Sequence, residues 1–125
     1  MKYLLDTHAL LWYAQGSAEL SLTAKSIMET EECLYTMASL WEIAIKQKLG
    51  KLDNSLSILE LKNFCRDAGF IFLPTRAEYV EVTKSLPFIH RDPFDRLLIS
   101  CAQCEGVTII TCDGKIPPYG VRTVW

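Results

Sequence analysis

Apolar and polar positions follow two patterns that alternate along the chain. Short apolar runs bounded by Gly, Pro or polar residues predict five β-strands, at residues 3–5, 33–36, 70–73, 107–111 and 121–124. Between the runs, apolar residues recur at helical spacing and predict helices at residues 8–14, 21–29, 40–49, 57–68, 75–85 and 93–105. Strands that alternate with helices from end to end favour a mainly parallel sheet with helices on both faces.

Capping residues mark several helix ends. Ser57 with Glu60, and Thr75 with Glu78, have the spacing of a capping box at the start of a helix. Asp92 suits the N-cap of the last helix because a proline follows it at the first helical position. Glycines at 50, 69 and 106 suit the ends of three helices.

The composition predicts one cytoplasmic domain. The chain has 125 residues, of which 50% are hydrophobic and 22% charged, as expected for a single domain spanning residues 1–125. Asp6 interrupts the N-terminal apolar run, so we expect no signal peptide, and no apolar run approaches the roughly 20 residues of a membrane helix. Five cysteines are an odd number and favour reduced thiols over a disulfide framework. Cys101 and Cys104 have C-x-x-C spacing but no second ligand pair, so we expect packing thiols there.

A net charge of −2 gives the chain no global basic field that would attract nucleic acid. Binding a polyanion therefore requires a local group of basic side chains, or metal ions that turn an acidic pocket into a phosphate site. The candidates for such contacts flank the acidic positions described next: Lys46, Arg91, Arg96 and Lys115.

Four acidic residues are predicted to meet at one edge of the sheet. Asp6 follows the first strand and Asp113 follows the fourth, so both belong at the carboxyl edge, where open α/β sheets bind ligands. Glu42 is expected in the first turn of the helix after the second strand, and Asp95 in the first turn of the helix before the fourth. Hard divalent cations bind carboxylate oxygens, so this cluster predicts a metal site at which a phosphodiester is hydrolysed.

Three of these acids also have purely structural interpretations. Glu42 stands three residues after Ser39 and four before Lys46, which suits a capping box or a helical ion pair. Asp95 in a first turn is favoured by the helix dipole. Asp113 precedes a glycine, as in an ordinary turn.

Asp6 is harder to explain structurally, because an acid directly after a buried strand needs hydrogen-bond partners or a cation. The two histidines, His8 and His90, have no evident partner in the sequence. A base and a metal ligand are the alternative roles for these two residues, but metal-free loop histidines are commoner, so we expect loop side chains there.

Four sequence blocks resemble those of the PIN-domain ribonucleases, in particular the VapC-type toxins of bacterial type II toxin–antitoxin pairs. They are LLDTHALLW, SLWEIAIKQKLGKL, HRDPFDRLLISCA and TIITCDGKIPPYGVRTVW, and together they cover nearly the whole chain. The resemblance implies a PIN-like three-layer sandwich with a small, mainly parallel five-stranded sheet flanked by helices. It assigns a Mg²⁺ site, with Mn²⁺ as a substitute, to Asp6, Glu42, Asp95 and Asp113, supported by Ser39 and Thr111.

The expected function is metal-dependent hydrolysis of RNA. Asp6, Glu42 and Asp95 are the principal ligands expected, with Asp113 assisting, and the resemblance implies a homodimer and a cognate antitoxin that blocks the site. Two other functions fit the same acidic α/β pattern. A receiver-like domain would accept a phosphoryl group on aspartate, and a non-catalytic binding module would use the frame without chemistry.

Overall fold

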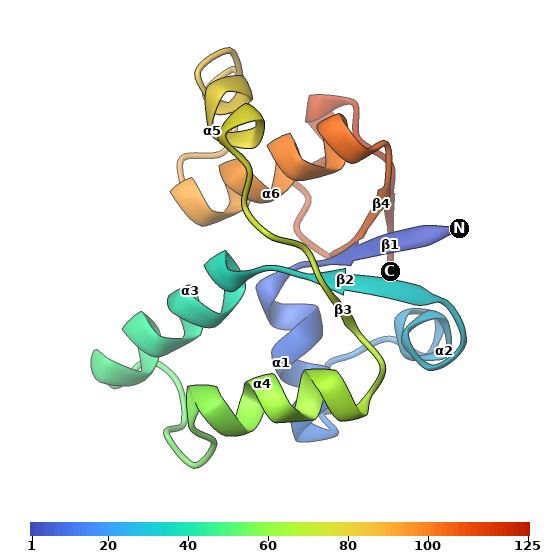
Figure 1. Cartoon of the computed structure of the whole chain (residues 1–125), viewed down its shortest axis with the longest axis vertical. Helices are drawn as coiled ribbons and strands as arrows, with labels where there is room; N and C mark the ends of the chain where they lie inside the picture. The colour runs from blue at the N-terminus through green and yellow to red at the C-terminus, as the bar shows by residue number, and fades with distance from the viewer.

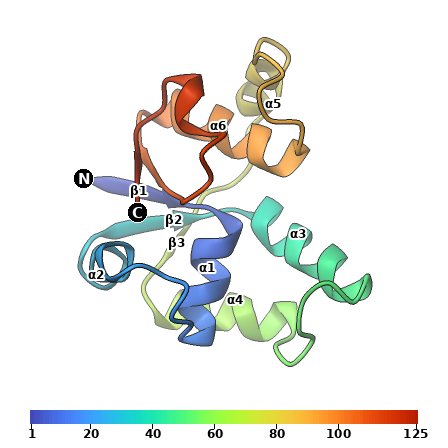
Figure 2. The same cartoon turned by 180° about the vertical axis from the view of Figure 1, so that it is seen from behind.

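A five-stranded parallel sheet lies between two layers of helices (Figures 1 and 2). The structure is a computed structural model that describes residues 1–125. The sheet has the order β3-β2-β1-β4-β5 and every pairing is parallel. Its strands are β1 (Lys2–Leu5), β2 (Glu32–Tyr35), β3 (Ile71–Phe72), β4 (Thr108–Ile110) and β5 (Thr123–Val124). The predicted PIN-like α/β architecture is thus confirmed.

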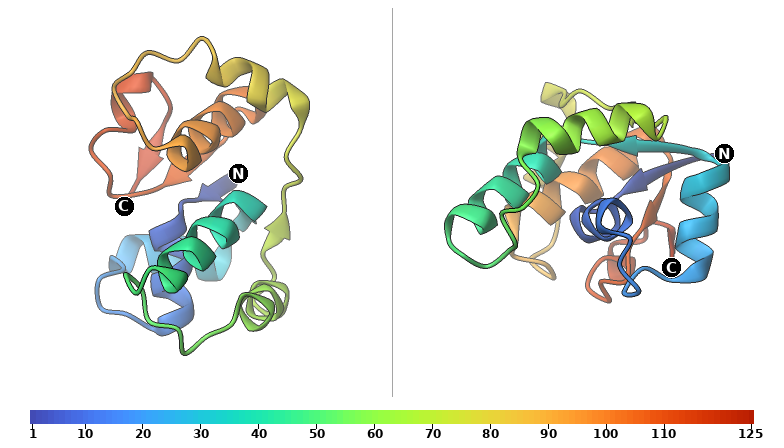
Figure 3. Two further views of the ribbon diagram at one scale, coloured as in Figure 1. Left: turned by 90° about the vertical axis from the view of Figure 1, so that its left-hand side faces the viewer. Right: turned by 90° about the horizontal axis from the view of Figure 1, so that it is seen from below.

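The helices divide between the two faces of the sheet (Figures 1 and 3). Helices α5 (Ala77–Thr83) and α6 (Pro93–Glu105) cover one face, and the other helical layer contains α1 (Thr7–Gln15), α2 (Leu22–Thr30), α3 (Met37–Lys48) and α4 (Ile58–Asp67). The central strand β1 serves both cores, because successive side chains of a strand point to opposite faces. Leu4 packs with the α5–α6 side and Leu5 with the other, and both are fully buried. Each such burial is worth roughly 1.5–3 kcal/mol.

Helix α3 begins three residues before the predicted start. The sequence predicts a start near residue 40 with Ser39 in a capping box, but the N-cap is Thr36, whose hydroxyl accepts from the Ser39 N–H at 3.4 Å. The capping-box interpretation of Ser39 and Glu42 is therefore wrong. Glu42 lies in the second turn of α3 rather than the first, so its side chain is free for contacts outside its own helix end.

Of the other predicted N-caps, two are confirmed and one is wrong. Ser57 and Asp92 cap α4 and α6 as predicted, and the Asp92 carboxylate accepts from the N–H groups of Phe94 and Asp95. Thr75 does not cap α5. That helix begins after Arg76, which forms no side-chain cap, so the predicted capping box there is wrong. A short 3₁₀ helix, η1 (Pro117–Tyr119), lies between β4 and β5 where the sequence predicts no regular element.

Two further expectations concern the environment of the cysteines and the absence of membrane-spanning helices. Cys33, Cys65 and Cys101 are buried, as packing thiols should be, whereas Cys104 is exposed, so the C-x-x-C spacing does not place its two thiols in one environment. None of the helices combines the length and apolar character needed to cross a membrane.

Candidate metal site

Asp6 stands at the junction of β1 and α1. It is only 5% exposed, and its Oδ1 accepts from the Ala9 N–H at 2.7 Å as the N-cap of α1. Burial raises the pKa of its carboxyl, while hydrogen bonds from the Thr111 hydroxyl and the Ala9 N–H act in the opposite direction. The fold therefore fixes this carboxylate in place. Helix capping is a role that the sequence analysis did not assign to it.

Glu42 is held by one contact at each carboxylate oxygen. Its Oε1 accepts from the Thr7 hydroxyl at 2.6 Å, and its Oε2 forms an ion pair with Lys46 Nζ at 2.8 Å, as the i,i+4 spacing predicts. The hydrogen bond between the side chains of Lys46 and Glu42 raises the pKa of Lys46. The Ser39 hydroxyl lies 3.2 Å from that of Thr7. Because Thr7 directly follows Asp6, it links the end of β1 to α3.

A compact group of three side chains forms the centre of the site. His90 Nε2 lies 2.7 Å from Asp113 Oδ2 and 3.1 Å from Asp95 Oδ2. One candidate ligand atom from each of the three residues lies within 4.8 Å of the others. These residues come from the loop before α6, the first turn of α6 and the segment after β4. The fold thus joins three segments that are separate in sequence.

The pKa values of the two carboxyls in this group are shifted in opposite directions. Burial raises the pKa of Asp95 to about 7, and the nearby charges of Asp92, Glu42 and Asp113 add to the rise, which a positive charge on His90 would oppose. Burial also acts on Asp113, but the Lys115 N–H, at 2.9 Å from Oδ1, and His90 outweigh it and leave the pKa of Asp113 below its usual value. One carboxyl is therefore poised to hold a proton while the other is ionised.

His90 is the residue that the sequence analysis missed. It is buried, and the expectation of an unpartnered loop histidine is wrong. Its main partner, Asp113, lies 23 residues away in the sequence, so no local pattern reveals the contact. Thr7 is missed for the same reason, because Glu42 lies 35 residues from it.

All four predicted acids lie at the carboxyl edge of the sheet, although in two groups. Asp95 and Asp113 belong to the compact group with His90, while Asp6 and Glu42 have their own partners. The groups are close enough to affect one another. The charge of Asp113 contributes to the raised pKa of Asp6, and that of Glu42 to the raised pKa of Asp95.

Thr111 also links Asp6 to Asp113. Its buried hydroxyl hydrogen-bonds to the Asp6 carboxyl and accepts from the Asp113 N–H at 3.0 Å. Of the four acids at this edge, only Glu42 forms an ion pair with a lysine or arginine, and such a group of carboxylate oxygens suits a hard divalent cation. The donor chemistry of the residues present therefore fits the metal expected from the sequence.

The basic residues near the acids have different roles. Lys46 pairs with Glu42, and Arg91 and Lys115 are exposed. Arg96, predicted as a candidate RNA contact, donates at 3.0–3.1 Å to the carbonyl oxygen of Thr83 at the end of α5 and to those of three residues in the loop before α6: Leu86, Pro87 and His90. Its guanidinium therefore holds the loop that carries His90.

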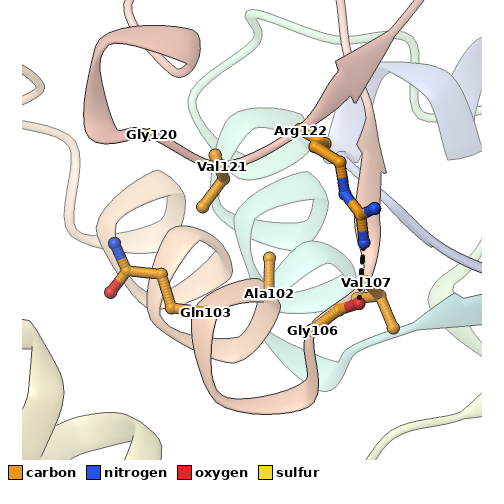
Figure 4. A pocket seen from close by; sticks show the side chains of 7 residues that line it. All are labelled: Ala102, Gln103, Gly106, Val107, Gly120, Val121 and Arg122. Atoms are coloured by element: carbon orange, nitrogen blue, oxygen red, sulfur yellow. Dashed lines mark hydrogen bonds between the residues drawn. The ribbon is translucent and has the colours of Figure 1, made fainter.

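A hollow of about 280 Å³ lies elsewhere, between the end of α6 and the segment after η1 (Figure 4). At one side of it, Arg122 donates to the Gly106 carbonyl at 3.2 Å. No carboxylate, histidine or cysteine lines it, since its residues are Ala102, Gln103, Gly106, Val107, Gly120, Val121 and Arg122. The acidic edge is therefore the better candidate for chemistry.

The fold and the acidic edge together define a known class of protein. The profile of the PIN domain family matches residues 3–120, so the chain belongs to the PIN domain family. None of the curated proteins matches the sequence.

Solved structures of toxin–antitoxin systems share this fold at low sequence identity. VapBC2 from Rickettsia felis, bound to a DNA fragment from its promoter, matches with a TM-score of 0.72 at 13% identity, over 99% of this chain and 98% of the other. A toxin–antitoxin complex from Klebsiella pneumoniae matches with a TM-score of 0.64 at 18% identity, over 98% and 96%. VapC20 from Mycobacterium tuberculosis, a toxin that cleaves the sarcin–ricin loop, matches with a TM-score of 0.66 at 15% identity, over 95% of each chain.

Proposed function

We propose that this PIN domain is a Mg²⁺-dependent endoribonuclease, with Mn²⁺ as a substitute ion, and the toxin of a toxin–antitoxin pair. Residues 1–125 act as one domain in this proposal. The observation that carries it is the meeting of Asp95, Asp113 and His90 at the sheet edge that also holds Asp6 and Glu42. The similarity to VapC20 supports RNA as the substrate, because that toxin cleaves an RNA loop.

The four carboxylates of Asp6, Glu42, Asp95 and Asp113 would hold the metal. When bound, a divalent cation polarises the phosphoryl oxygen, lowers the pKa of a bound water and stabilises the leaving oxygen. The chain contributes orientation: Ala9 fixes Asp6, and the Lys115 N–H fixes Asp113.

Thr7 and Lys46 hold Glu42 at its two oxygens in the same way. Because its pKa is raised to about 7, Asp95 holds a proton below neutral pH in the metal-free protein and would release it on metal binding. Arg91 and Lys115 are exposed beside the acids and are the proposed contacts to RNA phosphates, together with Lys46.

The proposed partners are a cognate antitoxin and a second copy of the chain, in the cytoplasm. Helix α3 supports a protein partner, because the helix and its C-cap carry a stripe of large apolar side chains at four-residue spacing that are 36–63% exposed: Met37, Trp41, Ile45 and the C-cap Leu49. The molar mass in solution, measured by light scattering, tests the dimer. A monomer at 100 µM, a concentration on the order of a weak dimer's dissociation constant, contradicts it.

Asp6→Asn tests the activity. The variant should lose RNA cleavage, because a carboxylate that would bind the metal becomes a neutral amide. The fold should persist, since Asn is also a good N-cap and can accept from the Ala9 N–H. Cleavage of RNA oligonucleotides in Mg²⁺ and the unfolding temperature are measured together. Asp67→Asn, an exposed aspartate on α4, is the matched control. If Asp6→Asn cuts RNA as fast as the parent, the proposal fails.

The strand order argues against a receiver-like function. Receiver-like domains have the flavodoxin order 2-1-3-4-5, whereas this sheet has the order 3-2-1-4-5. Labelling by a small phosphodonor, with no nuclease activity, would still select that function. Calorimetry with Mg²⁺ or Mn²⁺ distinguishes the nuclease from a non-catalytic binding module, because the absence of metal binding favours the module.

A further inference from the structure

We propose that His90 is a positioning residue of the metal site, acting as a neutral imidazole whose Nε2–H bridges Asp95 and Asp113 rather than as a metal ligand. This inference rests on the proposed function and assigns His90 a role within it. Three features support it: the tautomer of the ring, the anchoring of its backbone and the geometry of the bridge.

The hydrogen bonds of the ring assign the tautomer. Nδ1 of His90 lies 3.2 Å from the Asp92 N–H and accepts from it. A ring nitrogen that accepts a hydrogen bond carries no proton, so in the neutral ring the proton is on Nε2. That N–H faces Asp113 Oδ2 at 2.7 Å and Asp95 Oδ2 at 3.1 Å. Neither nitrogen then offers a free lone pair to a cation.

The backbone of His90 is anchored independently of its ring. Its N–H donates to the Tyr119 hydroxyl at 2.7 Å, and its carbonyl accepts from Arg96 at 3.1 Å. The Tyr119 hydroxyl in turn donates to the Pro87 carbonyl at 2.7 Å. A substitution of the His90 side chain leaves all these contacts available, so it tests the imidazole and not the course of the loop.

The bridge has a direct consequence for metal binding. When both carboxyls are ionised, oxygens that lie this close repel each other unless a donor or a cation stands between them. The Nε2–H supplies that donor in the metal-free protein and sets the spacing of Asp95 and Asp113. Asp113 Oδ1 is fixed separately by the Lys115 N–H at 2.9 Å. Hydrogen-bonding partners of metal ligands typically contribute about 10–100-fold in metal affinity.

The test uses two substitutions at position 90 and the full chain. His90→Leu removes the donor, and Mn²⁺ affinity measured by calorimetry should fall roughly 10–100-fold. His90→Gln keeps an N–H donor at similar reach and should retain Mn²⁺ affinity within about threefold of the parent. A higher Mn²⁺ concentration should restore part of the RNA cleavage that is lost in His90→Leu. Asp67→Asn, at an exposed aspartate of α4 outside the site, is the control and should bind Mn²⁺ like the parent.

A spectroscopic measurement distinguishes the bridge from direct ligation. Nitrogen-15 NMR of the metal-free protein should show His90 as the Nε2–H tautomer, and Nε2 should keep its proton when Mg²⁺ saturates the site. The two histidine spectra are assigned with His8→Leu. Unchanged affinity in His90→Leu, equal loss in the Leu and Gln variants, or loss of the Nε2 proton with Mg²⁺ would each overturn the inference. If the parent binds no metal, the proposed function fails first, whereas the tautomer is still measurable.

Discussion

Asp95→Asn should stabilise the metal-free protein at alkaline pH. The pKa of Asp95 rises from 3.8 to about 7, because its carboxyl is buried and faces the charges of Asp92, Glu42 and Asp113. A tenfold change in proton affinity is worth about 1.36 kcal/mol, so the rise corresponds to about 4 kcal/mol. The folded state binds the proton more tightly than the unfolded state does. The stability that this tighter proton binding gives the folded state is therefore fully present below pH 3.8 and is lost as the pH rises through about 7.

The amide of Asn is neutral at every pH and avoids that loss. Because the side chain is 20% exposed, water relieves part of the penalty, and we expect a gain of roughly 1–3 kcal/mol at pH 8 and little at pH 5. Urea unfolding in EDTA at both pH values measures it. Asp67→Asn, whose carboxyl is 72% exposed, should change stability little at either pH. A gain that is equal at pH 5 and pH 8, or absent at pH 8, would refute the electrostatic account of the site.

Two more predictions concern proton release and the loop before α6. Binding of Mn²⁺ should release most of a proton from Asp95 at pH 6 and little at pH 8, so the affinity for Mn²⁺ should rise with pH up to about 7. Calorimetry in buffers of different ionisation enthalpy measures the proton release, and no release at pH 6 contradicts the prediction. Arg96→Met should destabilise the protein by about 2–4 kcal/mol in urea unfolding, because four backbone carbonyls lose a charged donor. The exposed Arg91→Met should lose less than about 0.5 kcal/mol, and equal losses would contradict the role given to Arg96.

The elements of the fold could be predicted because their signals are local. Apolar runs and helical spacing lie within a few residues of one another, and all five strands and the six α-helices occur where the sequence predicts them. The first residue of a helix is harder to predict where two good N-cap residues lie close together. At α3, both Thr36 and Ser39 are good N-caps, and Thr36 prevails because β2 ends directly before it.

The acids of the site could be predicted, but their supporting contacts could not. Asp6 and Asp113 follow strands, so the topology of a parallel sheet places both at one edge. The partners of His90 and Arg96 depend on how the loop before α6 folds back, which no spacing in the sequence encodes. The structure therefore adds a histidine to the acidic cluster and gives Arg96 an architectural task in place of an RNA contact.

Arg96 holds its loop through main-chain oxygens, which every amino acid has. The side chain of Ile89 is 40% exposed, and none of the four carbonyl contacts belongs to this residue. Substitutions of Ile89 should therefore leave the loop in place beside the carboxylates, whereas the Phe88 ring contacts the Arg96 guanidinium, whose carbon lies 4.6 Å from the ring centroid. The exposed surface at Ile89 can therefore change while the acidic cluster beside it keeps its geometry.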